Sequence, residues 1–509
     1  MKKWTLFFSL AACLCLGILL FHFSTDRAVE KAEFSSIALP KQKNQYRGSI
    51  DDCLLSDTIY NRNDEIQSIC TENYVHFFPS EIQKNKKNEK RSPKDLKIGS
   101  FNLFHLGDNQ APMKSYAIVA SIINQWDLVG GQEMMPLASD IATENRKLGE
   151  AIQNQTSIDY PFSDWSVLAP GYLRVLRELQ KLDSSWALIL QPTSEGEGGA
   201  GEMAGFYYRS SIVQLKEWDY CAFEKSVDSK TQAQAPSYAC LTQAAEKVAK
   251  LTSRLAFAAF FKSDNFDFIA LTTHSRFRRS LDPKDLEAQK KAICNNHSQP
   301  DKCKIPLDQV GRYYEVLAVA EQIGKMKEDA KDADVIFMGD FNLELAPITV
   351  ENWKASLRPA PLLRPFQKDP TTVGIKFSKM ISSYDHFILD TKWTSECNAE
   401  ASQSYDFVKA AARGASSADK LIKQHLLPSA QKAVVAEKKM ETEKFIKVQN
   451  SSSGPVLRAL NEKEKDEINA SYDAALIRMK VNDYAVVLEL ISDHIPIEMN
   501  CKRDLPDDD

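Results

Sequence analysis

The sequence lacks an excess of positive charge and lacks cysteine pairs with CxxC spacing. There is no excess of positive charge, because 64 lysines and arginines stand against 69 aspartates and glutamates and the pI is about 6.0. A protein that binds nucleic acid over its whole surface is thereby excluded, and such binding would need a local basic patch. None of the eight cysteines after residue 23 has CxxC spacing, which argues against a structural zinc site.

The first 23 residues form a topological signal. Lys2 and Lys3 precede an uncharged, largely apolar run from Trp4 to Phe23, which is long enough to cross a bilayer as a helix. The two lysines favour a cytoplasmic N-terminus, so the rest of the chain is expected outside. An uncleaved membrane anchor fits the length best. A cleaved signal peptide and a lipoprotein signal at Cys13 are the alternatives, and all three would export the body of the protein.

The ten cysteines fit export. Two of them, Cys13 and Cys15, lie in the apolar run, and the remaining eight are an even number, which suggests disulfides. The simplest set of pairs is Cys53–Cys70, Cys221–Cys240, Cys294–Cys303 and Cys397–Cys501. Eight cysteines allow 105 sets of pairs, so this set is one hypothesis among many.

The rest of the chain divides into regions of different pattern. Hydrophobic residues make up 43% and charged residues 26% of the 509 residues, a balance typical of a packed globular protein. Residues 24–95 show little periodicity and end in a lysine-rich stretch, which is typical of a solvated linker. From residue 96 to residue 501, short apolar runs alternate with helical patterns, and this order predicts a layered α/β sandwich. Residues 502–509 form an acidic tail.

These patterns predict individual elements. Helices are expected at Ser115–Gln125 and Leu307–Met326. Strands are expected at Lys97–Leu103, Trp126–Gly130, Gly205–Tyr208, Leu255–Phe261, Phe266–Thr273, Val335–Met338, His386–Leu389 and Tyr484–Ile491. Residues 398–479 are rich in Ala, Lys and Glu, and because these residues favour helices, a helical insertion is expected between the last strands.

Polar residues occur where the predicted strands start or stop. In chain order they are Asn102, Glu133, Glu202, His274, Asp340, Asn342, Asp385, Asp493 and His494. Loops can bring such residues together at one edge of a sheet. Carboxylate and amide oxygens are ligands for Mg²⁺ or Ca²⁺, and two imidazoles can act as acid and base near neutral pH. Together these groups fit the hydrolysis of a phosphodiester.

Each of these residues, taken alone, also has a purely structural interpretation. The acids fit turns in contact with water, and the two histidines fit a core in which their hydrogen bonds are satisfied. Asp340 and Asn342 fit an Asx turn that closes a strand, and Glu202 fits the end of a flexible glycine-rich loop. The presence of all segments in one workable order favours the functional interpretation.

The order of the segments resembles the endonuclease/exonuclease/phosphatase superfamily, and within it deoxyribonuclease I. The motifs that carry the resemblance are Ser100-Phe101-Asn102, Gln132-Glu133, Gly339-Asp340-Phe341-Asn342 and Ser492-Asp493-His494. The similarity runs from about Leu96 to Met499, interrupted by the insertion. His274 favours the deoxyribonuclease branch, because the abasic-site repair enzymes of the superfamily lack a histidine there. The extension before Leu96 and the insertion after Cys397 are foreign to deoxyribonuclease I.

The resemblance implies a four-layered fold, in which two packed mixed sheets are flanked by helices. It also implies a divalent cation, Mg²⁺ with Ca²⁺ or Mn²⁺ as alternatives, held by Asn102, Glu133 and Asp493. Arg254, which precedes the strand before His274, would contact a phosphate.

The remaining residues receive roles in proton transfer. By the resemblance, His494 oriented by Asp385 would be the general base, and His274 oriented by Glu202 would be the general acid. Asp340 and Asn342 would position the attacking water and a phosphate oxygen.

The implied activity is that of an exported endonuclease that hydrolyses DNA, in the periplasm or outside the cell and with or without membrane attachment. Arg276, Arg278 and Arg279 follow His274 and fit contacts with a nucleic-acid backbone, or simply a solvated loop. A sphingomyelinase or inositol-phosphate phosphatase would keep the same chemistry with another substrate. A catalytically silent scaffold would keep the fold alone, although every expected site residue is present.

Overall fold

The computed structural model describes residues 75–77, 94–106, 114–135, 171–191, 202–221, 238–242, 254–276, 282–374, 379–409, 438–439, 442–443, 445–450, 454–478, 484, 487–488 and 491–506. The predicted membrane segment, Cys53, Cys70, Arg278 and Arg279 lie outside these residues. Within the described part of the chain, no helix is long and apolar enough to cross a bilayer.

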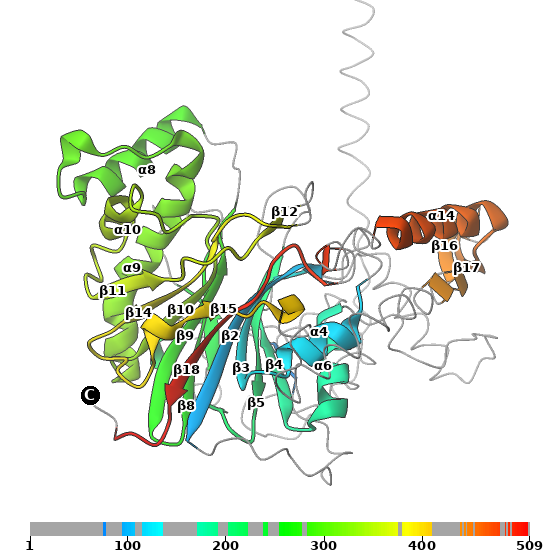
Figure 1. Cartoon of the computed structure of the whole chain (residues 1–509), viewed down its shortest axis with the longest axis horizontal. Helices are drawn as coiled ribbons and strands as arrows, with labels where there is room; N and C mark the ends of the chain where they lie inside the picture. The colour runs from blue at the N-terminus through cyan, green and yellow to red at the C-terminus, as the bar shows by residue number, and fades with distance from the viewer. Residues whose placement is uncertain are drawn as a thin grey trace, which may run out of the picture. The chain divides into compact units, whose positions relative to one another are not determined.

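Two mixed β-sheets form the centre of the fold (Figure 1). The first has the order β1 (Val75–Phe77), β4 (Trp186–Leu190), β5 (Met203–Arg209), β3 (Leu128–Met134), β2 (Asp95–Leu106), β18 (Ile497–Lys502) and β15 (Gln403–Ser404). The second has the order β11 (Leu363–Phe366), β14 (Asp385–Asp390), β10 (Val335–Asp340), β9 (Phe266–His274), β8 (Phe257–Ser263) and β6 (Gln214–Leu215), and β7 (Ala239–Leu241) also pairs with β8. Strands β2 and β3 are parallel, as are β9 and β10, whereas the other neighbours are antiparallel.

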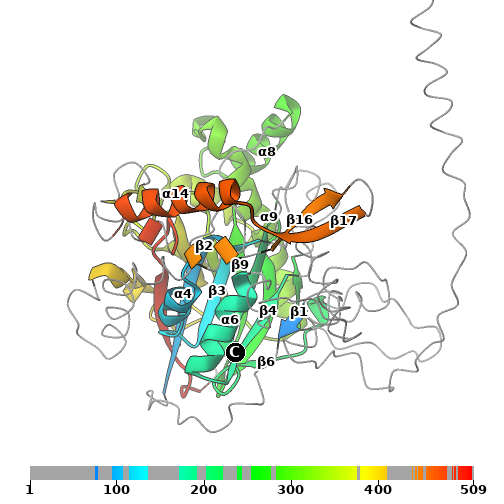
Figure 2. The ribbon, with the colours of Figure 1, turned by 90° about the vertical axis from the view of Figure 1, so that its right-hand side faces the viewer.

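Helices cover the outer face of each sheet. Helices α4 (Tyr116–Ile123) and α6 (Gly171–Leu182) share a hydrophobic cluster with the first sheet, and Figure 2 shows them lying across it. Helices α8 (Pro283–Asn295), α9 (Val310–Ala330) and α10 (Val350–Ser356) share another cluster with the second sheet. The predicted four-layered sandwich is therefore confirmed.

A third hydrophobic cluster fills the space between the two sheets. The ring of Phe206 on β5 lies 6.0 Å from that of Phe257 and 5.4 Å from that of Phe261, both on β8. Because sheets and helices cover them from both sides, β3 and β10 are buried at every position. This explains why the strand segments of the sequence are apolar without strict alternation.

Smaller elements complete the described structure. They are η3 (Asp219–Cys221), η4 (Pro300–Lys302), η5 (Leu307–Gln309), η6 (Ala399–Ala401), β12 (Val373–Gly374), β13 (Lys379–Met380), β16 (Phe445–Asn450), β17 (Gly454–Ala459) and α14 (Glu462–Arg478). Three of the predicted disulfides are present, namely Cys221–Cys240, Cys294–Cys303 and Cys397–Cys501.

The strand predicted at Tyr484–Ile491 is wrong. Tyr484 and residues 487–488 are helical, and the last strand of the first sheet is β18. Val487 and Ile491 are four residues apart and both fully buried, and the amide of Ile491 donates to the carbonyl of Val487. A short apolar run fits a buried helix as well as a strand, and here the packing selects the helix.

Two other regions differ from their predicted character. The insertion contains α14, but it also contains the hairpin of β16 and β17, so a wholly helical insertion is wrong. Pairing between two segments stabilises strands in a way that the propensity of each segment does not measure. Within the predicted linker, β1 pairs with the edge of β4. Three residues are too few to show a periodic pattern in the sequence.

Candidate active site

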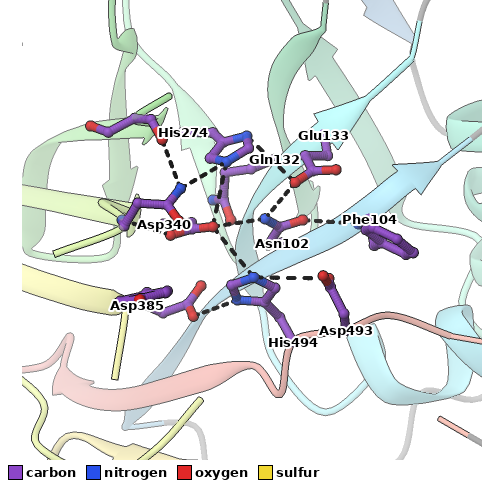
Figure 3. A network of polar contacts seen from close by, with 12 residues as sticks. Asn102, Phe104, Gln132, Glu133, His274, Asp340, Asp385, Asp493 and His494 are labelled. Carbon is purple, nitrogen blue, oxygen red and sulfur yellow. Dashed lines mark hydrogen bonds and ion pairs between the residues drawn. The ribbon is translucent and has the colours of Figure 1, made fainter. Parts of the chain in front are cut away.

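The predicted site residues meet at one edge of the two sheets (Figure 3). Strands β3, β9 and β10 end there, β5 and β14 begin there, and β2 carries Asn102 at the same level. The last contributor is the segment before β18, which holds Asp493 and His494. Neighbouring strands of opposite direction thus bring residues that are up to 392 positions apart, Asn102 and His494, into one network.

A bulge in β2 positions the first two predicted ligands, Asn102 and Glu133. Asn102 pairs with Gln132 and Leu106 pairs with Met134, so four steps along β2 correspond to two along β3. Within this bulge Phe104 and His105 adopt φ values of 42° and 51°, a region that side chains other than glycine seldom enter. Their backbone amides donate to Asn102 Oδ1 at 2.9 Å and to Glu133 Oε2 at 3.0 Å.

A glycine sets the position of Asp340. Gly339 has a φ of 145°, and a Cβ atom there would lie 2.0 Å from the carbonyl oxygen of Thr273 on β9. Only glycine allows β9 and β10 to approach so closely at this point. The amide of Asn342 then donates to Asp340 Oδ1 at 2.8 Å, which closes the predicted turn.

Asp340 lies between the two imidazoles. Its Oδ2 accepts a hydrogen bond from Asn102 Nδ2 at 3.0 Å and lies 3.5 Å from His274 Nε2 and 3.4 Å from His494 Nε2. The amide of Asn102 also donates to Glu133 Oε1 at 2.9 Å. Asn102 therefore links the carboxylate between the histidines to the carboxylate at the end of β3.

His274 has the carboxylate partner that the sequence predicts. Its Nδ1 lies 2.7 Å from Glu202 Oε2, and Asn342 Nδ2 lies 3.2 Å from its Nε2 and donates to the carbonyl of Ser275 at 2.7 Å. Burial lowers the pKa of His274, but the carboxylates of Glu202 and Glu133 together outweigh this effect and that of the Arg254 guanidinium, and the pKa rises to about 9. At neutral pH this imidazole is protonated and holds a proton at Nε2.

Arg254 reaches the site but is paired there. Its guanidinium contacts Glu202 Oε1, and NH1 donates to the carbonyl oxygen of His274 at 3.1 Å. NH1 is also 2.9 Å from His274 Nδ1, but a protonated Nδ1 donates to Glu202 and cannot accept from Arg254. In this structure Arg254 therefore orients Glu202 and His274, and its contact with a phosphate stays a prediction.

His494 has a matching arrangement. Its Nδ1 lies 2.7 Å from Asp385 Oδ2, and Thr371 ties the two segments together. The amide of Asp385 donates to Thr371 Oγ1 at 3.3 Å, and the amide of Ile495 donates to the Thr371 carbonyl at 2.6 Å. Although burial lowers the pKa of His494, the carboxylates of Asp385, Asp340 and Asp493 raise it well above its usual value.

The carboxylates beside Asn102 fit a divalent cation. Figure 3 shows Glu133 and Asp493 on the two sides of Asn102. Oδ1 of Asp493 is buried and makes no hydrogen bond, and burial together with the charge of Glu133 raises the pKa of Asp493. A buried carboxylate oxygen that lacks a hydrogen bond and lies close to a second carboxylate offers the oxygen ligands that Mg²⁺ or Ca²⁺ prefers.

Another group of possible ligands lies beside Oε1 of Glu133, the oxygen that also accepts a hydrogen bond from Asn102 Nδ2. Single atoms of Glu133, Glu202 and His274 lie within 4.8 Å of one another. However, both oxygens of Glu202 are engaged, one by Arg254 and the other by His274. An ion there would compete with the Arg254 guanidinium and with the proton that His274 Nδ1 shares with Glu202, so the side of Asn102 and Asp493 is the better cation site.

Sequence reasoning missed three residues of this region. His105 and Thr371 gave no signal, because their importance depends on the bulge and on backbone contacts. Lys114 is only 2% exposed, and its Nζ donates to the carbonyls of Leu103, at 2.8 Å, and of Ile491. It thereby joins the bulge to the segment before Asp493. Burial lowers its pKa to about 7, against the opposing effect of the Asp493 and Glu133 carboxylates.

Comparisons with known proteins add structural neighbours only. No family model and no curated protein matches the sequence. Among solved structures, the chain is similar to an endonuclease/exonuclease/phosphatase family protein from Bacteroides thetaiotaomicron, with 11% identity, a TM-score of 0.34, and coverage of 81% of this chain and 98% of that one. It is also similar to a beta toxin from Staphylococcus aureus, with 11% identity, a TM-score of 0.33, and coverage of 79% of this chain and 99% of that one. A third similar structure is D. rerio TDP2 complexed with a single-strand DNA product, with 12% identity, a TM-score of 0.31, and coverage of 80% of this chain and 98% of that one. Structures named for the endonuclease/exonuclease/phosphatase family are thus among those to which this chain is similar.

Proposed function

We propose that this chain is a divalent-metal-dependent phosphodiesterase and that it acts as an endonuclease on DNA, like deoxyribonuclease I. One observation carries the proposal. Two imidazoles, each backed by a carboxylate at 2.7 Å, direct their Nε2 atoms toward the same oxygen of Asp340. Displacement at phosphorus needs a base on one side and an acid on the other, and this pair can supply both.

Asn102, Glu133 and Asp493 would hold the cation. When bound, a divalent ion there would neutralise the charge of the phosphate and of the transition state. The backbone amides of the bulge fix Asn102 Oδ1 and Glu133 Oε2 in place. Lys114 and the hydroxyl of Ser492, which donates to the carbonyl of Asn102 at 2.7 Å, hold the two segments that carry these ligands together.

His274 is suited to the role of acid. Its pKa of about 9 keeps it protonated at neutral pH, and Glu202 holds the Nδ1 proton, so the Nε2 proton is available to the leaving oxygen. Asn342, fixed by the Ser275 carbonyl, would orient a phosphate oxygen beside it.

His494 would take the proton of the attacking water. A base must be neutral, whereas Asp385, Asp340 and Asp493 favour the charged imidazole. The role therefore requires that part of this negative potential be offset when the site is filled. Asp385 keeps the Nδ1 proton and leaves Nε2 free to accept.

The decisive experiment is plasmid nicking by the purified protein with Mg²⁺, with EDTA and after His274→Ala. The proposal expects nicking that needs the cation and is lost in the variant. Intact plasmid after incubation with folded, Mg²⁺-supplied protein would contradict a DNA endonuclease.

A lipid phosphodiester is the second candidate. Two large apolar side chains are exposed on segments that lead from the site, Ile348 at 89% and Ile381 at 49%. The backbone amide of Ile381 donates to the carbonyl of Thr372 at 2.9 Å, and Thr372 forms an antiparallel β-bridge with His494. Release of phosphocholine from sphingomyelin vesicles, without plasmid nicking, would favour this substrate.

Export stays part of the proposal. The three disulfides support it, because such bonds persist in oxidising compartments. The predicted anchor at residues 1–23 would attach the enzyme to a membrane, and fractionation of cells that express the full chain would test this.

A further inference from the structure

The bulge in β2 carries a third imidazole to the candidate cation site. His105 is the second of the two residues with positive φ, and its amide donates to Glu133 Oε2 at 3.0 Å. Its side chain returns toward the same carboxylate, so that Nε2 lies 3.6 Å from Oε2. Both the backbone amide and the side chain of His105 thus contact Glu133 Oε2 at the end of β3.

The position of His105 differs from that of His274. His274 faces Oε1 of Glu133, where Asn102 also donates, whereas His105 faces Oε2. The side chain of His105 is 39% exposed, while that of His274 is only 13% exposed. His105 can therefore be reached from solvent at the edge of the site, on the face of Glu133 that the proton-transfer pair does not occupy.

The geometry points to His105 as a nitrogen ligand of the cation at Glu133, which makes the site selective for transition-metal ions over Mg²⁺. This inference rests on the cation site of the proposed function. A nitrogen and an oxygen 3.6 Å apart can share an ion at bond lengths of about 2.0–2.2 Å, at an angle of about 110–130°, which is at or somewhat above the tetrahedral value.

The chemistry of the donor atoms decides the selectivity. Mg²⁺ prefers oxygen ligands, whereas imidazole nitrogen favours ions later in the first transition row, such as Co²⁺. The carboxylates and the amide of the site serve either ion, so His105 is the residue that shifts the balance. The backbone supports this assignment, because two consecutive non-glycine residues at positive φ are strained, and such strain persists mainly at functional sites.

The test measures metal affinity without any substrate. Metal-free full-length protein is titrated with MgCl₂ and with CoCl₂ by isothermal titration calorimetry, and the visible absorption of the Co²⁺ complex is recorded. The variant is His105→Asn, since asparagine accepts positive φ but its side chain is shorter. His297→Asn is the matched control, because His297 lies two residues after α8 and accepts a hydrogen bond from the backbone amide of Gln299 at 3.0 Å, which asparagine can retain.

We expect His105→Asn to weaken Co²⁺ binding by at least about tenfold, with a changed absorption band and Mg²⁺ affinity altered less than about threefold. Unchanged Co²⁺ affinity would overturn the inference, and so would an equal loss for both ions. His105→Gly, which also accepts the backbone conformation, keeps the test valid if the asparagine variant unfolds. Wild-type protein that binds neither ion would refute the cation site itself, and with it the proposed function.

Discussion

Asp340 Oδ2 lies 3.4 Å from His494 Nε2, so a carboxylate stands next to the nitrogen that would accept the proton of the attacking water. The same oxygen lies 3.5 Å from His274 Nε2. Without substrate, Asp340 thus faces two imidazoles whose pKa values are both raised, to about 9 for His274 and well above the usual value for His494, which favours their charged forms. Binding of a phosphate requires that these charges be redistributed, so the resting site and the working site differ in protonation.

Replacing either imidazole should abolish most of the activity. We expect His274→Gln and His494→Gln to lower the rate of phosphodiester cleavage by about 10²–10⁴-fold, because each removes one proton-transfer group. The measurement is single-turnover cleavage at saturating cation, with thermal unfolding to verify the fold. His297→Gln, outside the site, should retain full rate. A loss below tenfold in a folded variant would contradict the acid–base assignment.

Cation binding should release protons. The carboxylates of Asp340 and Asp493 help to raise the pKa of His494, and a divalent ion beside them would oppose this effect and lower it. We expect net proton release on Mg²⁺ binding at pH 8, measured by calorimetry in two buffers of different ionisation enthalpy. The release should be smaller in His494→Gln. Identical binding enthalpies in the two buffers would show that no proton is linked to the ion.

Stability should depend on pH through His274. Its pKa is about 9 in the folded protein and about 6.5 when unfolded. The folded state thus holds the proton more tightly, so the stabilisation is fully present below pH 6.5 and is lost as pH rises to 9. In EDTA, we expect the stability advantage of wild type over His274→Gln to shrink by up to about 3 kcal/mol between pH 6 and 9.5. An advantage that grows with pH would reverse the sign of this linkage.

The disulfides should differ in their effect on stability. Cys397 and Cys501 are 104 residues apart, whereas Cys294 and Cys303 are nine apart. Loop-closure entropy gives about 4.7 kcal/mol for a loop of roughly 100 residues and less than about 3 kcal/mol for one shorter than 15. Denaturant unfolding of the two double-serine variants should show the larger loss for Cys397→Ser with Cys501→Ser. Equal losses would rule out the loop-length account.

The parts of the fold that sequence patterns predicted are those fixed by burial on both sides. Strands such as β9 and β10 are largely apolar and buried, and each ends in a polar residue that the edge of the sheet brings into the site. The hairpin of β16 and β17 could not be predicted in this way, since its stability comes from pairing between two segments. The apolar run that ends at Ile491 was ambiguous because both periods suited it.

The site shows the same division. His274, Asp340 and His494 were predictable because short motifs place them at strand ends. The contribution of His105 depends on a backbone conformation that Phe104 and His105 do not favour, and no composition signal announces it. Likewise, the guanidinium of Arg254 was assigned to a phosphate, and its pairing with Glu202 becomes visible only when the strands are assembled.

The bulge in β2 sets stability against activity at a defined point of the chain. Deleting two residues between Asn102 and Leu106 would equalise the spacing of β2 and β3 and keep the alternation of side chains, because the deleted number is even. The shorter strand would lose its strained residues and form a more regular ladder, yet Glu133 would lose both contacts with His105. Selection for heat resistance alone would therefore tend to erase this feature, and only selection for function would retain it.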